Sequence, residues 1–313
     1  MFKPKIKVKS IILVFHFINL PLFAQSIIPL DYLYSIGSSG DSLGQFNNPQ
    51  AITIGSSGNL YVVDTGNNRI QIFDLEGNFI KYFGGLGQGQ EQFDSPLDIN
   101  FQDGLNVFVT DFNNHRVYRL DRQLNAISII SGEVAYGNVE NFFFPKSITV
   151  SKQGDIFLVE GENNSVIKFD SFFKPISKFG SIETGEGYLS SPTQIENLGV
   201  GFLVVSDKQA GHLVVFDYFG NFIRFLGGEK LQEPSGLFYW NERELLLVTD
   251  IGTGKIHAFN RKKWIVELVS IQKSDESKWQ TPVDIAVFEN RIFVLDQKNS
   301  SILVYKILLN QKE

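Results

Sequence analysis

The sequence predicts an all-β fold, a six-bladed β-propeller of four-stranded antiparallel blades whose last blade is closed by the N-terminal strand. A proline recurs at positions 49, 96, 145, 192, 234 and 282. An acidic residue recurs at positions 64, 111, 160, 207, 250 and 296. Both series advance in steps of 42 to 49 residues, and strand-like runs fill each step. Such a period is typical of a propeller blade and not of a helical repeat.

The first repeat shows the strand pattern most clearly. Apolar residues alternate or form short runs in Asn59–Asp64 and in Arg69–Asp74. Gly-Asn and Asn-Asn steps separate such runs, as tight hairpin turns require. No stretch has a sustained helical period, and the aromatic content of 13% suits pleated, half-buried surfaces. Each of the first five repeats is therefore expected to supply four strands.

The sixth repeat contains only three strand-like runs, the last at 301–307. The segment Asp31–Gly37 (DYLYSIG) resembles the fourth strands expected at Phe79–Gly84 and Phe222–Gly227. We expect it to pair antiparallel with 301–307 and so to close the ring, which removes an open strand edge. By the period of two, one face of this strand is expected to carry Tyr32, Tyr34 and Ile36.

Residues 1–24 are predicted to be a signal peptide. Four lysines precede an apolar run of 13 residues, 11–23, and Ala24 supplies a small residue before a cleavage point. The run is shorter than the about 20 apolar residues of a membrane-spanning helix, and no second run of that length follows. We expect residues 25–313 to form a single propeller, exported to the periplasm or outside the cell and without a membrane span. An uncleaved N-terminal anchor is the alternative.

The charge balance and the absence of cysteine narrow the choice of partners. The chain has 28 Lys and Arg against 34 Asp and Glu, a net charge of −6. Residues 1–24 contain four Lys and no acid, so 24 basic and 34 acidic residues remain, a net charge near −10. That charge repels phosphate backbones, so nucleic acid is not an expected partner. Without Cys there can be no disulfide, thiolate metal site or Cys nucleophile.

The first repeat resembles an NHL repeat. Pro49–Gly84 carries the resemblance, with P-x-x-I, then GNLYVVDTGNNRIQIFD, then G-N-F and F-G, after a GQF lead-in at Gly44–Phe46. The pattern weakens later: Glu160 stands at the Asp position of the third repeat, and the Arg position holds Ser165, His212, Lys255 and Ser301. The resemblance implies an interaction scaffold, so we expect a monomer that binds a protein, peptide or glycan ligand through one propeller face.

Two sets of repeated residues are interpreted as structural. The acids that close the second strands are expected to accept hydrogen bonds from turn N–H groups, and Arg69 and Arg116 to pair with the first two. An apolar residue three positions before each Pro is expected to plug the space between neighbouring blades. These residues are Phe46, Phe93, Phe142, Leu189, Leu231 and Trp279.

The innermost strand of each blade begins just after its Pro and is expected to line a central channel. The second residue after the Pro is, in blade order, Ala51, Asp98, Ser147, Gln194, Gly236 and Asp284. The fourth, on the same side of the strand, is Thr53, Asn100, Thr149, Glu196, Phe238 and Ala286. The candidate ligand-binding residues are therefore Asp98, Asn100, Gln194, Glu196 and Asp284.

Oxygen-rich side chains at these positions suit a hard cation, so Asp98, Glu196 and Asp284 are candidate ligands of Ca²⁺, the cofactor we consider. Calcium-dependent lactonase-type propellers, which the arrangement resembles, carry such a cluster in their channel. The alternative is a polar channel filled by ordered water.

Two classes of function remain open. The first is the binding scaffold. The second is a metal-dependent hydrolase or lyase at the central channel, which would need the carboxylates to converge on an ion with an open coordination position. No G-x-S-x-G, H-E-x-x-H or P-loop motif is present. The histidines after residue 24 occupy different repeat positions and cannot form one ring of zinc ligands; they are His115, His212 and His257. We therefore assign no catalytic residue and favour the scaffold.

Overall fold

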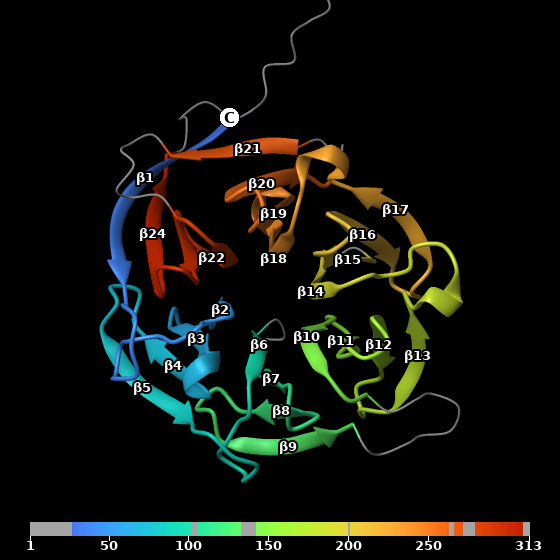
Figure 1. The fold of residues 1–313 in the computed structure, drawn as a ribbon, viewed down its shortest axis with the longest axis horizontal. Helices are drawn as coiled ribbons and strands as arrows, with labels where there is room; N and C mark the ends of the chain where they lie inside the picture. The colour runs from blue at the N-terminus through green and yellow to red at the C-terminus, as the bar shows by residue number, and fades with distance from the viewer. Residues whose placement is uncertain are drawn as a thin grey trace, which may run out of the picture.

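The computed structural model of the chain describes residues 27–101, 106–132, 142–199, 201–262, 266–271 and 279–308. The signal peptide predicted for residues 1–24 lies outside these residues. Small sheets stand around a central opening, each with one strand at the centre and one at the rim (Figure 1). In the described ranges, no helix combines the length and apolar character needed to cross a membrane.

The strands follow the chain from the centre of each blade to its rim. Blade 1 contains β2 (Ala51–Ile54), β3 (Leu60–Asp64), β4 (Arg69–Phe73) and β5 (Phe79–Gly84). Blade 2 contains β6 (Pro96–Asn100), β7 (Val107–Asp111), β8 (Arg116–Leu120) and β9 (Ala126–Ser131). Blade 3 contains β10 (Pro145–Val150), β11 (Ile156–Glu160), β12 (Ser165–Phe169) and β13 (Pro175–Phe179).

The second half of the ring repeats this order. Blade 4 contains β14 (Pro192–Asn197), β15 (Phe202–Asp207), β16 (His212–Asp217) and β17 (Phe222–Leu226). Blade 5 contains β18 (Pro234–Trp240), β19 (Leu245–Asp250), β20 (Lys255–Asn260) and β21 (Val266–Ile271). Blade 6 contains β22 (Pro282–Phe288), β23 (Arg291–Asp296), β24 (Ser301–Ile307) and β1 (Ile27–Ile36). Single 3-10 turns occur at η1 (Thr65–Asn67), η2 (Ile182–Thr184), η3 (Gly228–Lys230) and η4 (Asn241–Arg243). The predicted six-bladed propeller is confirmed.

The apolar residue before each Pro packs between neighbouring blades, as expected. The exposed fraction of the six plug side chains is at most 4%. The plug side chain also explains why several outer strands end in Gly, since it leaves no room for a Cβ atom at that position. A Cβ on Gly84 would lie 2.6 Å from the ring of Phe93, and one on Gly227 would lie 2.3 Å from Leu231. Both glycines have positive φ, so the plug and the turn select the same residue.

The N-terminal strand closes the ring, as predicted. β1 pairs antiparallel with β24, with Leu30 opposite Ile307 and Ile36 opposite Ile302. The strand is longer than expected, and its first residues, from Ile27 to Leu30, pair in parallel with β21 of blade 5. β1 therefore joins blades 5 and 6 into one eight-stranded sheet. Figure 1 shows β1 lying along the rim between β21 and β24.

The expectation that Tyr32, Tyr34 and Ile36 share one face is wrong. Tyr32 lies opposite Tyr305 but Tyr34 lies opposite Val304, because the register shifts at Leu33. A bulge of this kind reverses the side of every later residue. Tyr32 therefore packs with the core between blades 5 and 6. Tyr34 and Ile36 pack with the core between blades 6 and 1.

Candidate functional site

The channel wall is built from the six inner strands, which lie nearest the centre of the ring (Figure 1). In five of them the register shifts just after the Pro, for example between Pro96 and Ile99. Each inner strand is the edge of its sheet and is paired on one side only. The backbone N–H groups on its other side therefore need another acceptor.

The second residue after each Pro supplies that acceptor to the next blade. Asp98 of blade 2 accepts the N–H of Ile148 in blade 3 through Oδ2, at 2.9 Å. Ser147 of blade 3 accepts the N–H of Ile195 in blade 4 through Oγ, at 3.1 Å. Two further residues continue the pattern: Gln194 Oε1 accepts the N–H of Leu237, and Asp284 Oδ2 accepts that of Ile52 in blade 1 at 2.8 Å. We call these four side chains the channel ring.

Blades 1 and 5 have no acceptor side chain at this position, since Ala51 and Gly236 stand there. The following blade compensates in each case. Asp98 also accepts the N–H of its own neighbour Ile99 through Oδ1, at 2.8 Å. Asp284 does the same for Ile285 at 2.9 Å. An Asp therefore stands where one side chain must serve two backbone donors.

Gly236 also fits a steric need. A Cβ at this position would lie 2.5 Å from the Cα of Asp284, so blade 5 could not approach blade 6 this closely with any larger residue. Across the channel, Gln194 donates from Nε2 to Asp284 Oδ1 at 3.3 Å. The ring thus carries both backbone contacts and a direct side-chain bridge.

A second set of contacts between blades was not predicted from the sequence. Thr110, Ser206 and Thr249 each precede a strand-closing Asp and accept the N–H of the ring position in their own blade. Each hydroxyl also donates to a carbonyl of the next blade, at 3.2, 2.7 and 3.1 Å respectively. The repeat alignment does distinguish these hydroxyl residues, because the position before the strand-closing acid is aliphatic in the other blades. The aliphatic residues are Val63, Val159 and Leu295.

A cavity of about 310 Å³ lies at the end of the channel where the inner strands finish. We call it the lower cavity. All five predicted ligand-binding residues line it: Asp98, Asn100, Gln194, Glu196 and Asp284. The structure therefore brings together the residues that the repeat alignment selected.

The carboxyl groups of the lower cavity are largely enclosed by protein: Asp98 and Asp284 are buried and Glu196 is half-buried. Glu196 accepts the N–H of Tyr239 through Oε1 at 3.2 Å. Burial, together with the nearby carboxyls of Asp98 and Asp284, raises the pKa of Glu196 to about 8. Burial also raises the pKa of Asp98, and it raises the pKa of Asp284 well above its ordinary value. At neutral pH Glu196 is therefore mostly an uncharged acid.

The same geometry bears on the Ca²⁺ expectation. The oxygens of Asp98 and Asp284 already accept backbone N–H groups, whereas a calcium site needs its carboxylate oxygens directed at the ion. Within the part of the chain that the structure describes, no group of three or more His, Asp or Glu side chains is placed to hold a metal ion. The proposed ligation by Asp98, Glu196 and Asp284 gains no support from the geometry and stays a prediction for chelation to test.

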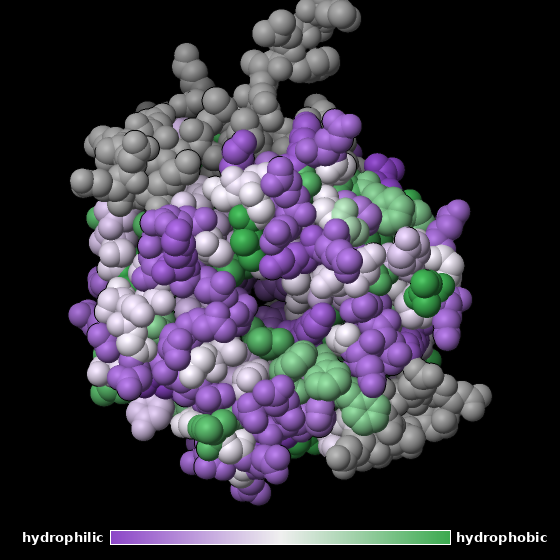
Figure 2. All heavy atoms as spheres, in the orientation of Figure 1, coloured by the Kyte–Doolittle hydropathy of each residue, from purple (hydrophilic) through white to green (hydrophobic). Residues whose placement is uncertain are grey.

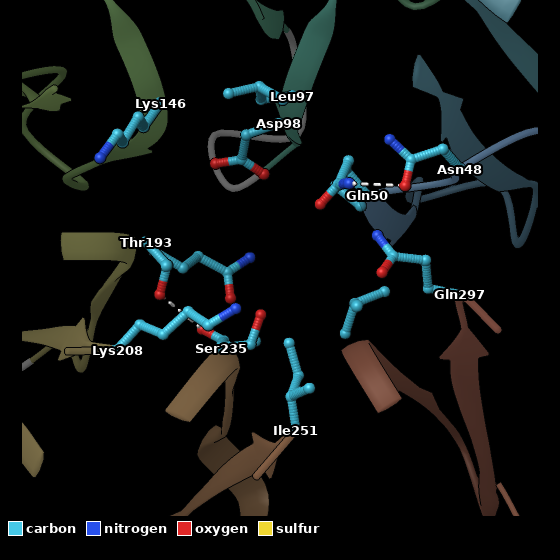
Figure 3. Close-up of a pocket in the computed structure, with 14 residues that line it drawn as sticks. Asn48, Gln50, Leu97, Asp98, Lys146, Thr193, Lys208, Ser235, Ile251 and Gln297 are labelled. Carbon is cyan, nitrogen blue, oxygen red and sulfur yellow. Dashed lines mark hydrogen bonds between the residues drawn. The ribbon is translucent and has the colours of Figure 1, made fainter. Parts of the chain in front are cut away.

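A larger cavity, of about 430 Å³, lies at the other end of the channel, where the inner strands begin. We call it the upper cavity. Its wall combines amide and hydroxyl side chains with aliphatic ones and two lysines, and it shares Asp98 and Gln194 with the lower cavity. Figure 3 shows Asn48, Gln50, Thr193, Lys208 and Gln297 around this cavity, coming from different blades. In the space-filling view, mostly hydrophilic side chains border the central hollow (Figure 2).

The two lysines of the upper cavity differ in their surroundings. Lys146 donates to the carbonyl of Pro192 at 3.3 Å, and burial lowers its pKa. Lys208 forms an ion pair with Glu233 at 3.3 Å and is partly exposed. Neither lysine was predicted from the sequence, because only the second and fourth residues after each Pro were considered as channel residues. Lys146 directly follows a repeat Pro, and Lys208 directly follows a strand-closing Asp.

The strand-closing acids are structural, as interpreted, and four of them accept the expected turn N–H groups: Glu160, Asp207, Asp250 and Asp296. Asp64 accepts the backbone N–H of Asn47 at 2.7 Å and pairs with Arg69 at 2.8 Å. Asp111 and Arg116 repeat that pairing at 2.7 Å. The other four also accept N–H groups of the segment that leads into their own blade: Glu160, Asp207, Asp250 and Asp296. None of the three described histidines lines either cavity.

Comparison with known proteins agrees with this fold. The NHL repeat family model matches residues 46–73. A segment of 53 residues, 17% of this chain, is 42% identical to the Protein brain tumor of Drosophila melanogaster. A segment of 48 residues, 15% of this chain, is 42% identical to the B-box type zinc finger protein ncl-1 of Caenorhabditis elegans. These segments span only 5% and 6% of the length of the two relatives.

Solved structures resemble the whole ring. A streptogramin B lyase superposes with a TM-score of 0.60 at 15% identity, covering 89% of this chain and 88% of the other. Virginiamycin B lyase from Staphylococcus aureus gives 0.59 at 16% identity, covering 88% and 95%. A protein of unknown function from Bacteroides thetaiotaomicron gives 0.67 at 13% identity, covering 88% and 76%. At such identities the likeness extends to the fold alone. The chain is a six-bladed β-propeller whose first blade carries an NHL repeat.

Proposed function

We propose that this protein is an exported binding scaffold that takes a protein, peptide or glycan ligand at the upper cavity. One observation carries the proposal: the upper cavity gathers amide and hydroxyl side chains from several blades, in a volume of about 430 Å³. Such a lining recognises hydrogen-bonding ligands, since each amide can both donate and accept. Ligand sites are usually concave, with a few convergent polar groups that fix the orientation of the ligand.

The charges of the upper cavity favour a ligand rich in acceptor oxygens. Among the described residues, Lys146 donates to one backbone carbonyl and Lys208 pairs with one partly exposed carboxylate. An ammonium group can form three hydrogen bonds, so both lysines retain donors for a ligand. Backbone carbonyls, carboxylates and sugar hydroxyls would all meet that need.

The NHL repeat adds an argument from analogy, because this propeller fold commonly mediates binding. The lyases named above share only the fold, so we do not extend their chemistry to this chain.

The test compares binding by the parent protein with binding by variants of the upper cavity. Parent protein, Gln297→Ala and Lys208→Ala would be applied to a glycan array and to a display library of random peptides. We expect ligands selected by the parent to lose about tenfold in affinity in each variant, the usual cost of removing a charged or amide hydrogen bond. The matched controls are Gln153→Ala and Lys174→Ala, whose exposed side chains lie outside both cavities. Equal binding by all five proteins would refute the proposal.

Export is tested separately. If residues 1–24 are a cleaved signal peptide, mass spectrometry of protein from the periplasm or medium should find an N-terminus at or near Gln25. A retained Met1 on membrane-bound protein would support the uncleaved anchor instead.

A further inference from the structure

Four aromatic side chains gather beside the upper cavity, at the junction of blades 2 and 3. Phe112 follows the strand-closing acid of blade 2, and Phe143 and Phe144 precede the repeat Pro of blade 3. The ring centroids of Phe112 and Phe144 lie 5.1 Å apart. The His115 ring lies 5.0 Å from Phe144 and 6.0 Å from Phe143. Phe143 is 38% exposed and the other three are partly exposed, so they form one surface, which we call the aromatic patch.

The fold does not require an aromatic residue at the two positions before the Pro. In the other five blades these positions are polar: Asn47 and Asn48, Asp94 and Ser95, Ser190 and Ser191, Gln232 and Glu233, and Gln280 and Thr281. What the segment supplies to the fold is a backbone N–H for the strand-closing acid, as Phe144 does for Glu160 at 3.4 Å. Apolar patches rimmed by polar residues mark interaction sites, and a departure from the repeat pattern is typical of functional positions.

The aromatic patch adjoins the upper cavity. Gly161 occupies the position at which Lys208 and Gln297 line that cavity in blades 4 and 6. A Cβ on Gly161 would lie 3.3 Å from the Cβ of Phe144 and 2.7 Å from the Cε of Lys146. The missing side chain therefore leaves Phe144 next to Lys146, which lines the cavity. Figure 2 shows apolar side chains reaching outward from the edge of the central hollow that lies over blades 2 and 3.

The charged side chains that reach the upper cavity are mainly positive. Among the described residues, Lys146, Lys208 and Asp98 are its charged lining. The carboxyl group of Asp98 is buried, and its oxygens already accept the N–H groups of Ile99 and Ile148. The two lysines therefore favour a carboxylate in the ligand, because a hydrogen bond between two charged groups is stronger than one between neutral groups.

An apolar patch beside two ammonium groups favours a peptide over a glycan. Three of the four side chains of the aromatic patch have no hydrogen-bonding group. A sugar ring that covered Phe143 and Phe144 would lose the hydrogen bonds of its hydroxyls to water without replacing them. An aliphatic or aromatic side chain of a peptide has no such cost, and its burial against the patch is favourable.

We propose that the upper cavity and the aromatic patch together bind an acidic peptide segment of a partner protein. A large apolar side chain of the segment packs on Phe143 and Phe144. A carboxylate a few residues away pairs with Lys146 or Lys208, and the peptide backbone meets the amide and hydroxyl groups of the cavity wall. This inference rests on the proposed binding function of the upper cavity and names the chemistry of its ligand.

The probe is an array of peptides that carry one Glu and one Phe at different spacings in a Gly-Ser background. Matched arrays replace the Glu by Gln, the Phe by Ser, or both. We expect the parent protein to bind its best Glu–Phe peptides about tenfold more tightly than their matched counterparts, because each replacement removes one anchor.

The variants use residues that other blades hold at the same positions, so that the fold is kept. Phe143→Ser/Phe144→Ser copies the pair of blade 4, and it should lose the preference for Phe over Ser while it keeps that for Glu over Gln. Lys146→Gln/Lys208→Gln copies blades 1 and 6, and it should lose the preference for Glu over Gln. The matched control is Phe172→Ser, since Phe172 is 87% exposed and lines neither cavity.

If the melting temperature shows that the double Ser variant folds poorly, Phe143→Ser alone changes the exposed ring and should weaken the preference for Phe. The inference is overturned if the parent binds none of the arrays or all of them equally, or if the Ser variants keep the full preference for Phe. Binding of a glycan or a neutral peptide that Gln297→Ala and Lys208→Ala weaken, and that the Ser variants leave unchanged, would uphold the proposed function and refute this inference.

Discussion

The carboxylate of Asp284 in the last blade accepts the backbone N–H of Ile52 in the first blade, at 2.8 Å and across 232 residues of sequence. This contact closes the channel ring at the centre of the propeller, while β1 closes it at the rim. The two closures act on the same junction, because blade 6 meets blade 1 only after the whole chain has folded around. The stability of the ring is therefore expected to depend on both.

Asp284→Ala should destabilise the protein by about 2–4 kcal/mol, because it leaves the N–H groups of Ile52 and Ile285 buried without an acceptor. Asp284→Asn keeps one acceptor oxygen and should cost less. Chemical denaturation of both variants and the parent gives the comparison. If the Ala variant unfolds at the denaturant concentration of the parent, the channel ring does not hold the blades together.

Deletion of residues 25–37 should lower the melting temperature of the whole ring and promote aggregation, because it exposes the edges of both β21 and β24. Single substitutions within β1 should destabilise the protein in proportion to how deeply the side chain is buried. Ile36 is 4% exposed, and Ile36→Ala should cost about 2–4 kcal/mol. Leu33 is 40% exposed at the bulge, and Leu33→Ala should cost less than about 1 kcal/mol. Calorimetry and light scattering measure both outcomes, and a truncated protein that melts like the parent would contradict the closure.

Stability should fall as the pH rises through about 8. The folded-state pKa of Glu196 is raised from 4.5 to about 8 by burial, so the folded protein binds a proton that the unfolded chain releases between these values. This contribution is fully present below pH 4.5 and is lost as the pH passes the folded value. Melting temperatures measured between pH ~7 and ~9 test it, because His212 and His257, whose pKa values burial lowers, are already neutral there. Glu196→Gln should flatten the profile, and an unchanged slope in this variant would assign the pH dependence to other groups.

Chelation tests the Ca²⁺ expectation. Because the oxygens of Asp98 and Asp284 already accept backbone N–H groups, we expect the same melting temperature with and without EDTA. An ion that bound only the folded state would stabilise it, and its removal would lower the melting temperature. A drop in EDTA that Ca²⁺ restores, and that Asp98→Ala abolishes, would establish the calcium site.

The repeat alignment alone determined the number of blades, the strand order and the position of the plugs. These follow from local rules, since each repeat buries the same residues against the same neighbours. Asp64 with Arg69, and Phe46 with its equivalents, could be assigned from sequence because their partners lie within the repeat or at its border. The alignment also selected Asp98, Asn100, Gln194, Glu196 and Asp284, which do meet at one cavity.

The sequence could not predict which groups these side chains contact. Whether Asp98 faces an ion or the backbone of blade 3 depends on how far one inner strand is shifted past the next, and only the packed ring sets that distance. The same holds at the rim. A period of two places Tyr32 and Tyr34 on one face, but a single bulge at Leu33 sends them to different cores and lets β1 also reach β21. Contacts between blades are decided by tertiary geometry, because no local pattern records the offset between strands that lie hundreds of residues apart.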